Sequence, residues 1–216
     1  MIPTGGPVTN VLWVILIILV LGFLGGSWLN RRRSKAIGMW LKGGLKPVGG
    51  QSTWKWIRGM NSAAQVTVEG AARPFRRMEI SYFLMTREFA PLWGYEWLRG
   101  KRDLLAARIE LRGAPAYEVE IVARGGKLQK TLDANAGSQP FAWIEGAAGL
   151  GIGSRGAGAQ PAADRLKPFV ERYGPYIQRL SLRPRQPNIM LFMNLNGPEK
   201  TSAEEFVRAL RDAIGD

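Results

Sequence analysis

The sequence predicts an α+β protein, with a single N-terminal transmembrane helix followed by one domain. That domain is expected to have a mostly antiparallel sheet built from hairpins, with two or three helices. Three observations predict this class. Residues 8–28 carry no charge, several later runs alternate apolar and polar residues, and helical patterns gather in the C-terminal third. Successive strands with few helices are typical of an antiparallel sheet covered on one side.

The apolar segment "VTNVLWVILIILVLGFLGGSW" (8–28) is long enough to cross a bilayer, because about 21 residues at 1.5 Å each span roughly 30 Å. We expect a transmembrane helix over 8–29 after an extracytoplasmic N-terminus of 1–7. A cleaved secretory signal is one alternative, but it would need a basic leader and a shorter apolar run, and residues 1–7 contain no basic side chain. A helix buried in a core is the other. The pattern favours an uncleaved signal anchor.

Basic residues follow this segment directly and none precedes it. Because short cytoplasmic flanks carry the excess of Lys and Arg, we expect the N-terminus outside the cell membrane and the C-terminal domain in the cytoplasm. Tryptophans near the end of the span suit the membrane interface. The residues expected to set the topology or contact the interface are Arg31, Arg32, Arg33, Lys35, Trp28 and Trp40.

Residues 30–64 form the expected basic, Trp-bearing juxtamembrane collar and linker. From 30 to 59 there are eight Lys or Arg, three Trp and no acid. Ile37, Trp40, Leu41 and Leu45 recur at helical spacing, which predicts a brief amphipathic helix lying on the lipid headgroups. "KPVGGQS" (46–52) then predicts a linker to the domain.

The basic residues of this collar alternate with aromatic ones, as in surfaces that bind anionic lipid or single-stranded RNA through charge and stacking. No RNA-binding motif or zinc finger accompanies them, so nucleic acid is the less favoured partner. The residues expected to contact an anionic surface or a partner are Lys42, Lys46, Lys55, Arg58, Trp54 and Trp56.

The cytoplasmic domain is expected over 65–216. "QVTVEG" (65–70) and "EISYFLMT" (79–86) have strand character, and "PLWGYEWLRGK" (91–101) is an aromatic connection broken by Gly and Pro. "LAARIELRGAPAYEVEIVARGG" (105–126) predicts a hairpin whose outer face carries paired Arg and Glu, including Glu118 and Glu120. A carboxylate pair can be catalytic, but a solvated strand face with Arg partners is the favoured interpretation.

The C-terminal third predicts a helix at "ADRLKPFVERYG" (163–174) and a second hairpin at 176–197. The final helix, 201–216, has Ser202 as its N-cap and Glu205 three residues later, the spacing of a capping box.

Residues 146–161 are rich in Gly and Ala, which predicts a mobile surface loop. Gly151, Gly153 and Gly156 satisfy G-x-G-x-x-G, yet a dinucleotide fingerprint needs a strand immediately before it and an acid after the next strand. Arg183 and Arg185 stand where that acid should be. No cofactor is therefore expected.

The chain contains no His and no Cys, which excludes disulfides, thiolate catalysis, Cys/His zinc sites and histidine acid–base chemistry. Its carboxylates Asp103, Asp133, Glu145 and Asp164 are scattered singly, so no catalytic or metal-binding residues are assigned. The sequence leans toward a non-enzymatic protein. An enzyme that uses carboxylates with a hard metal, or a Lys, Tyr and Ser set, stays open.

The expected function is that of a membrane-anchored accessory or scaffold protein whose domain docks on a partner protein or a membrane assembly. The expected partner patch is the exposed aromatic set Trp93, Tyr95 and Trp97. The alternative is a membrane-tethered module that binds anionic lipid headgroups or RNA through the basic collar.

Overall fold

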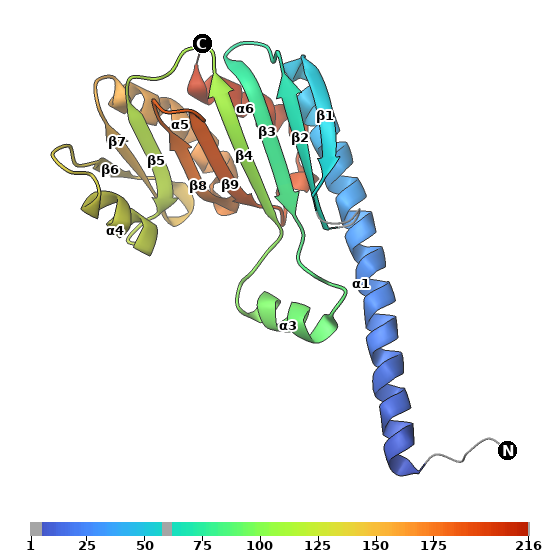
Figure 1. Ribbon diagram of the computed structural model, residues 1–216. Helices are drawn as coiled ribbons and strands as arrows, with labels where there is room; N and C mark the ends of the chain where they lie inside the picture. The colour runs from blue at the N-terminus through green and yellow to red at the C-terminus, as the bar shows by residue number, and fades with distance from the viewer. Residues whose placement is uncertain (1–5, 58–61, 216) are drawn as a thin grey trace.

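The computed structural model describes residues 6–57 and 62–215. The helices are α1 (Pro7–Leu45), α3 (Ala90–Leu98), α4 (Lys127–Ala134), α5 (Ala159–Tyr173) and α6 (Ala203–Ile214). The strands are β1 (Gln51–Trp56), β2 (Ala63–Glu69), β3 (Phe75–Phe83), β4 (Leu104–Leu111), β5 (Glu118–Ala123), β6 (Ala142–Glu145), β7 (Leu150–Arg155), β8 (Ile177–Leu182) and β9 (Ile189–Asn194). Figure 1 shows their arrangement.

Within the described residues, nine strands form one antiparallel sheet in the order β1-β2-β3-β4-β9-β8-β5-β7-β6. Helices α5 and α6 and the end of α1 lie behind the sheet in Figure 1. The prediction of an N-terminal apolar helix followed by an α+β domain is confirmed.

The core lies between the sheet and these helices. Strand residues of alternating position, such as Val66, Met78 and Leu191, are buried against helical side chains that include Phe169 and Phe206. Because side chains alternate across a strand, the remaining residues of β2, β3, β4 and β9 point to the opposite face. Figure 1 shows that face toward the viewer, with only α4 near one end of it.

Helix α1 continues without a break from the apolar segment into the domain. Its 39 residues are about 58 Å long at 1.5 Å each. Ile37, Leu41 and Leu45 are 0%, 5% and 7% exposed and belong to the domain core. The expectation that they lie on the headgroups is therefore wrong, because the sheet and α6 already cover that apolar face. Gly44 permits the close approach, since a Cβ there would lie 2.8 Å from the Cβ of Ala203.

The predicted hairpin over 176–197 is confirmed by the pairing of β8 with β9. The predicted hairpin over 105–126 is wrong: β4 pairs with β3 and β9, whereas β5 pairs with β7 and β8. The β8–β9 hairpin is inserted between the two strands. Local alternation therefore identified both strands but assigned them the wrong neighbours.

The expected mobile loop over 146–161 is also wrong. A short 3-10 turn (Ala147–Gly149), strand β7 and the start of α5 occupy it. Gly151 and Gly153 lie beneath the ring of Trp143, and a Cβ on Gly153 would come within 2.7 Å of that ring. The first two glycines of the G-x-G-x-x-G pattern thus make room for an aromatic side chain.

Three further segments bear on the predictions. The final helix has its expected cap, because the Ser202 hydroxyl accepts a hydrogen bond from the Glu205 amide.

Within 91–101, expected as an irregular connection, the chain forms α3. Residues 51–56, placed in the linker by their composition, pair with β2 as the edge strand β1.

Candidate functional site at the membrane-proximal junction

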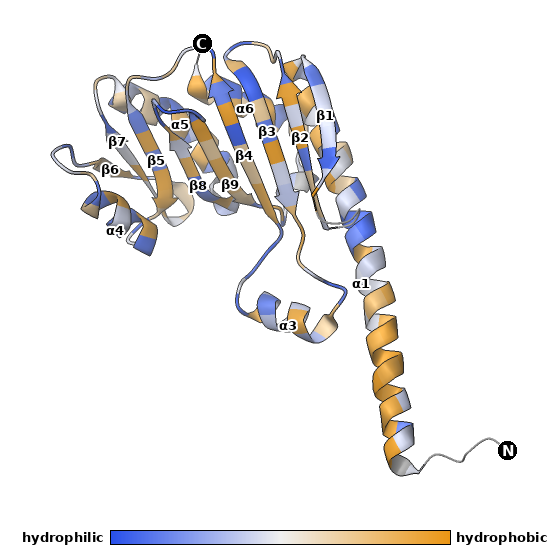
Figure 2. Cartoon of the chain, in the orientation of Figure 1, coloured by the Kyte–Doolittle hydropathy of each residue, from blue (hydrophilic) through white to orange (hydrophobic). Residues whose placement is uncertain are grey.

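The described residues contain one helix that is long and apolar enough to cross a membrane, and it lies near the N-terminus. Its most apolar 18 residues have a mean hydropathy of 2.6, and none of them is buried in the described structure. Figure 2 shows this apolar stretch on the half of α1 that projects from the domain. Leu12, Ile18 and Leu24 are each about three-fifths exposed there. Such a helix needs an apolar surrounding that the domain does not supply.

Asp103 lies at the junction between this segment and the domain, just before β4, and its side chain is fully buried. Its carboxylate accepts hydrogen bonds from the Nε of Arg33, from Nη2 of Arg87 at 2.8 Å and 3.0 Å, and from the Met85 amide at 2.8 Å. A buried carboxylate is stable only when cations and donors surround it in this way. Arg33 is on α1, so one ion cluster ties the end of the span to the domain.

Further polar contacts extend this cluster. Arg33 also donates from Nη2 to the carbonyl oxygen of Leu195 at 2.8 Å. The buried Asn30 donates to the carbonyl oxygen of Met85 at 3.1 Å and accepts from Arg87 at 2.8 Å. These contacts involve successive turns of α1 and fix the rotation of the helix against the domain as well as its position.

One turn after Asn30 on α1, the Ser34 hydroxyl is 2.7 Å from the phenol oxygen of Tyr82 in β3. Tyr82 is 1% exposed. Burial raises the pKa of this phenol above its ordinary value, and the hydrogen bond to Ser34 lowers it by less. Hydrogen bonds between buried groups specify one arrangement of the helix, because any other leaves a buried group without a partner.

The residues expected to set the topology divide into two groups. Arg31, Arg32 and Lys35 are exposed, and Arg32 lies 5.7 Å above the ring of Trp28. Arg33 turns inward to Asp103. Trp40 is only partly exposed: it packs on Phe206 at a centroid distance of 5.7 Å and donates to the Thr201 carbonyl oxygen at 2.9 Å. It therefore makes a contact between α1 and α6.

The expected anion-binding residues are brought together only in part. Lys42, Lys46 and Trp54 line one open hollow of about 320 Å³. Lys55 and Trp56 are exposed farther along β1, and Trp56 is 49% exposed. Arg58 lies outside the described residues.

The expected aromatic patch lies on α3. Tyr95 and Trp97 are 54% and 52% exposed, whereas Trp93 is partly covered. None of the nine residues of this helix is buried by the described structure. Its neighbour is the apolar half of α1, and Figure 1 shows α3 suspended below the sheet beside that half.

The uncovered face of the sheet carries a row of partly exposed apolar side chains across its middle strands. Phe83 pairs with Leu104, and Ala106 pairs with Phe192, so these residues are neighbours across β3, β4 and β9. Phe83 is 38% exposed. Apolar groups gathered on an open sheet face are typical of a protein contact surface.

The carboxylates considered as catalytic candidates have structural partners. Glu118 binds Arg155, and Glu120 binds Arg179 and the Ser181 hydroxyl. The remaining pairs are Asp133 with Trp143 Nε1, Glu145 with Arg124, and Asp164 with Lys167. Among residues 6–57 and 62–215, no three His, Cys, Asp or Glu side chains group as metal ligands would. The arrangement gives no convergent acid–base pair.

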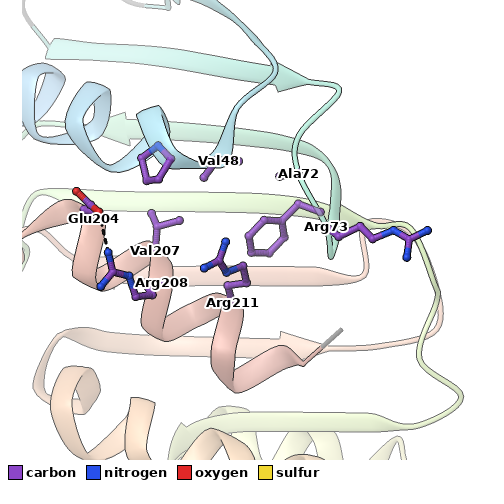
Figure 3. A pocket seen from close by; sticks show the side chains of 9 residues that line it. Val48, Ala72, Arg73, Glu204, Val207, Arg208 and Arg211 are labelled. Atoms are coloured by element: carbon purple, nitrogen blue, oxygen red, sulfur yellow. Dashed lines mark hydrogen bonds and ion pairs between the residues drawn. The ribbon is translucent and has the colours of Figure 1, made fainter.

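Two cavities of the domain have several arginines in their lining. The cavity in Figure 3 lies between α6 and the turn after α1, with Arg73, Arg208 and Arg211 around it. Its volume of about 70 Å³ holds only a few water molecules. A larger open hollow of about 490 Å³ has Arg73, Arg112 and Arg165 in its lining.

Sequence reasoning missed the junction itself. It found Arg33 only as a topology charge, and it treated Asp103 as one scattered acid. One signal was available: Asn30, Arg33 and Ser34 stand at positions i, i+3 and i+4, which places three polar groups on one face of the helix just after the apolar span. No protein-family model matches the chain, and no curated protein is similar to it.

Proposed function

We propose that this chain is a single-pass, membrane-anchored, non-enzymatic accessory protein that holds its α+β domain at a fixed position on the cytoplasmic face for a partner protein to dock on. One observation carries the proposal: α1 runs unbroken from an exposed apolar segment into the domain core, and the Asp103 cluster fixes it there. Simple attachment to a membrane requires only a flexible linker. A rigid junction is useful when the domain must present one face at a set height and angle.

The orientation follows from the charges beside the span. Arg31, Arg32 and Lys35 remain exposed immediately after it, where they act as cytoplasmic flanking charges and keep the uncleaved anchor in the cell membrane. Arg33 contributes to the same excess although it is paired, because orientation is set before the domain has folded.

The uncovered sheet face is the docking surface in this proposal. Its apolar row, defined by Phe83, Leu104, Ala106, Met190 and Phe192, lies in the middle of the sheet and not at a β-edge. A central apolar patch surrounded by charged pairs such as Glu79–Arg108 has the anatomy of a protein interface.

The test is purification of the tagged full-length protein from its native membranes in mild detergent, followed by mass spectrometry and nucleic-acid staining. A stoichiometric protein partner is expected with the wild type, and loss of that partner is expected with Phe192→Lys. Leu128→Lys, which changes an exposed leucine on α4, is the matched control and should retain the partner. Recovery of all three proteins without a protein partner would contradict the proposal.

A second candidate rests on the hollow shared by Lys42, Lys46 and Trp54. Two ammonium groups beside an indole ring suit an anionic ligand with a flat base or headgroup, either RNA or anionic lipid. Binding of full-length protein to labelled RNA, or to anionic in place of neutral vesicles, should then weaken steeply with salt and with Lys42→Ala/Lys46→Ala. Binding that ignores salt would remove this candidate.

A further inference from the structure

Helix α3 is apolar, yet none of its residues is fully buried in the described structure. Its sequence "APLWGYEWL" contains one charged residue, Glu96, whose side chain pairs with Lys101. Leu92 and Leu98 are 42% and 78% exposed, and Phe89 at its N-cap is 49% exposed. In water this surface would be unfavourable by about 25 cal/mol for each Å² of apolar area.

The position of α3 along α1 identifies what covers it. A Cβ on Gly26 would lie 1.9 Å from the carbonyl oxygen of Arg87, and a Cβ on Gly22 would lie 3.7 Å from the Cβ of Ala90. The start of α3 therefore contacts the span itself. Gly26 and Gly22 precede Arg31 by five and nine residues, which is roughly 7 Å and 13 Å along a helix.

The positions of Gly22 and Gly26 along α1 are on the membrane side of the flanking charges. Figure 2 shows the apolar half of α1 beginning at the level of α3, and Figure 1 shows α3 lying across the direction of α1. Helices that lie in the plane of a membrane insert their apolar side chains about 5–10 Å into the boundary between headgroups and acyl chains. The contacts of Gly22 and Gly26 place α3 in that layer if α1 crosses the membrane.

The aromatic residues of α3 and the arginines that follow the helix have the arrangement of an interfacial belt. Arg99 lies 4.9 Å above the ring of Tyr95, and Arg102 lies 5.5 Å above the ring of Trp97. On α1, Arg32 lies over Trp28 in the same way. Indole and phenol rings with cations on their water side are enriched at the headgroup level.

We infer that α3 is a second membrane contact, an interfacial helix that inserts its aromatic and leucine side chains among the lipids of the leaflet on the domain's side. This assigns lipid, and not a protein partner, to the exposed rings of Tyr95 and Trp97, whereas Trp93 is partly covered by the protein. A single span can tilt in the bilayer and carry the domain with it, and a second contact beside the span limits that tilt. The inference rests on the membrane anchoring in the proposed function and adds orientation to it.

The absence of native cysteine allows single-site spin labels on the full-length protein in phosphatidylcholine–phosphatidylglycerol vesicles. Three variants are compared: Leu98→Cys on α3, Ile18→Cys in the span, and Leu128→Cys on α4, an exposed leucine on another short helix. Collision rates are measured with oxygen, which concentrates in lipid, and with a water-soluble nickel chelate. We expect the label at residue 98 to collide several-fold less often with the nickel chelate than the label at residue 128 does. Its ratio of oxygen to nickel collisions should place it deeper than the label at 128 and shallower than the label at 18.

The outcomes separate this inference from the proposed function. If the label at 98 meets nickel as often as the label at 128 while the label at 18 is lipid-exposed, α3 is outside the membrane and the inference fails, although anchoring stands. If the label at 98 is shielded from both reagents, a second copy of the chain covers α3 and lipid is the wrong occupant. If the label at 18 meets nickel freely, the span is not inserted and both proposals fail.

Discussion

At the scale of single residues, neighbouring arginines of α1 have different roles. Arg31 and Arg33 are equivalent as flanking charges, but Arg31 is exposed whereas Arg33 binds a carboxylate that has no access to water. The difference follows from helix geometry, since residues two apart point about 200° away from each other. Only one of them can face the domain.

Replacing Arg33 with Gln should therefore lower stability more than replacing Arg31 with Gln. Removal of a cationic partner from buried Asp103 should cost about 2 kcal/mol, within the range for hydrogen bonds to charged groups, because Arg87 still neutralises the acid. An exposed charge should change stability by no more than about 0.5 kcal/mol. Thermal unfolding of both variants in detergent, followed by circular dichroism, measures this, and equal shifts would contradict the role given to the Asp103 cluster.

Two buried tyrosines offer a second comparison at this scale. The Tyr82 hydroxyl is bonded to Ser34, whereas the Tyr173 hydroxyl has no hydrogen-bond partner among the described residues. Tyr82→Phe should destabilise the fold by about 1 kcal/mol, and Tyr173→Phe should leave stability unchanged or raise it slightly. Both changes keep the ring, so packing is held constant. Denaturant titration measures the free energy of unfolding of both variants. A larger loss of stability in Tyr173→Phe than in Tyr82→Phe would contradict the prediction.

The same phenols predict how the fold responds to alkali. Burial raises the pKa of Tyr82 and of Tyr173, so the folded state binds their protons more tightly than the unfolded state does. Their contribution to stability is present below the unfolded pKa of about 10 and is lost as the pH rises through the folded pKa. The double Phe variant should therefore lose less stability than the wild type as the pH rises above about 10. Parallel losses in unfolding midpoints above that pH would show that these phenols do not contribute.

At the scale of elements, the contact of α1 with the chain that leads into α3 depends on a glycine. Gly26 leaves space for the Arg87 carbonyl group, and Arg87 is also a partner of Asp103. The neighbouring Gly25 has no atom within 4 Å of the position that a Cβ would take. The two adjacent glycines therefore form a matched pair.

Gly26→Ala should displace the segment around Arg87 and destabilise the junction by about 1–3 kcal/mol, as overpacking does. Gly25→Ala should be neutral or slightly stabilising, because Ala is the better helix former. Limited trypsin digestion in detergent measures the effect. Cleavage at Arg87, Arg99 and Lys101 should become faster in the Gly26 variant alone, and similar cleavage of the two variants would contradict the contact.

Local patterns predicted elements well and their partners poorly. The Ser202 cap, the 176–197 hairpin and the apolar half of α1 all rest on residues close in sequence, where spacing carries the signal. The partners of β4 and β5 depend on a hairpin that lies about 60 residues after β5 and about 80 after β4, which no local pattern contains. Likewise, the Gly/Ala segment 146–161 indicated a loop because the reason for its glycines, the ring of Trp143, comes from another strand.

The sequence predicted where the candidate site lies but not which residues pair within it. Charge and aromatic content located the membrane-proximal region, because these properties are visible in composition. The pairing of Arg33 with Asp103 joins residues 70 apart, and the burial of Ile37 and Leu41 depends on a sheet that forms downstream. An amphipathic helix that covers a sheet has the same periodicity as one that lies on lipid, so the sequence alone could not separate the two.

At the scale of the whole molecule, the proposals describe a domain that is joined rigidly to one span and oriented relative to the membrane by a second lipid contact at α3. Their common premise is that residues 8–28 cross the membrane with the domain on the cytoplasmic side. Arg31 and Arg32 are exposed on α1 just after its apolar stretch, and the described residues before them carry no charge at all. The difference in basic residues across the span is therefore large, which predicts a single orientation.

Two single-cysteine variants test that orientation directly, because the natural chain offers no competing thiol. Gly6→Cys, exposed before the span, should react with a membrane-impermeant maleimide in intact cells, since it lies outside. Gln178→Cys, exposed on β8, should react only after the cells are permeabilised. Replacing Arg31, Arg32 and Lys35 with Gln should make a fraction of the Gln178→Cys protein reactive from outside, because the basic asymmetry is then reduced. Labelling of residue 178 in intact cells without that replacement would reverse the assigned topology and move the docking face outside the cytoplasm.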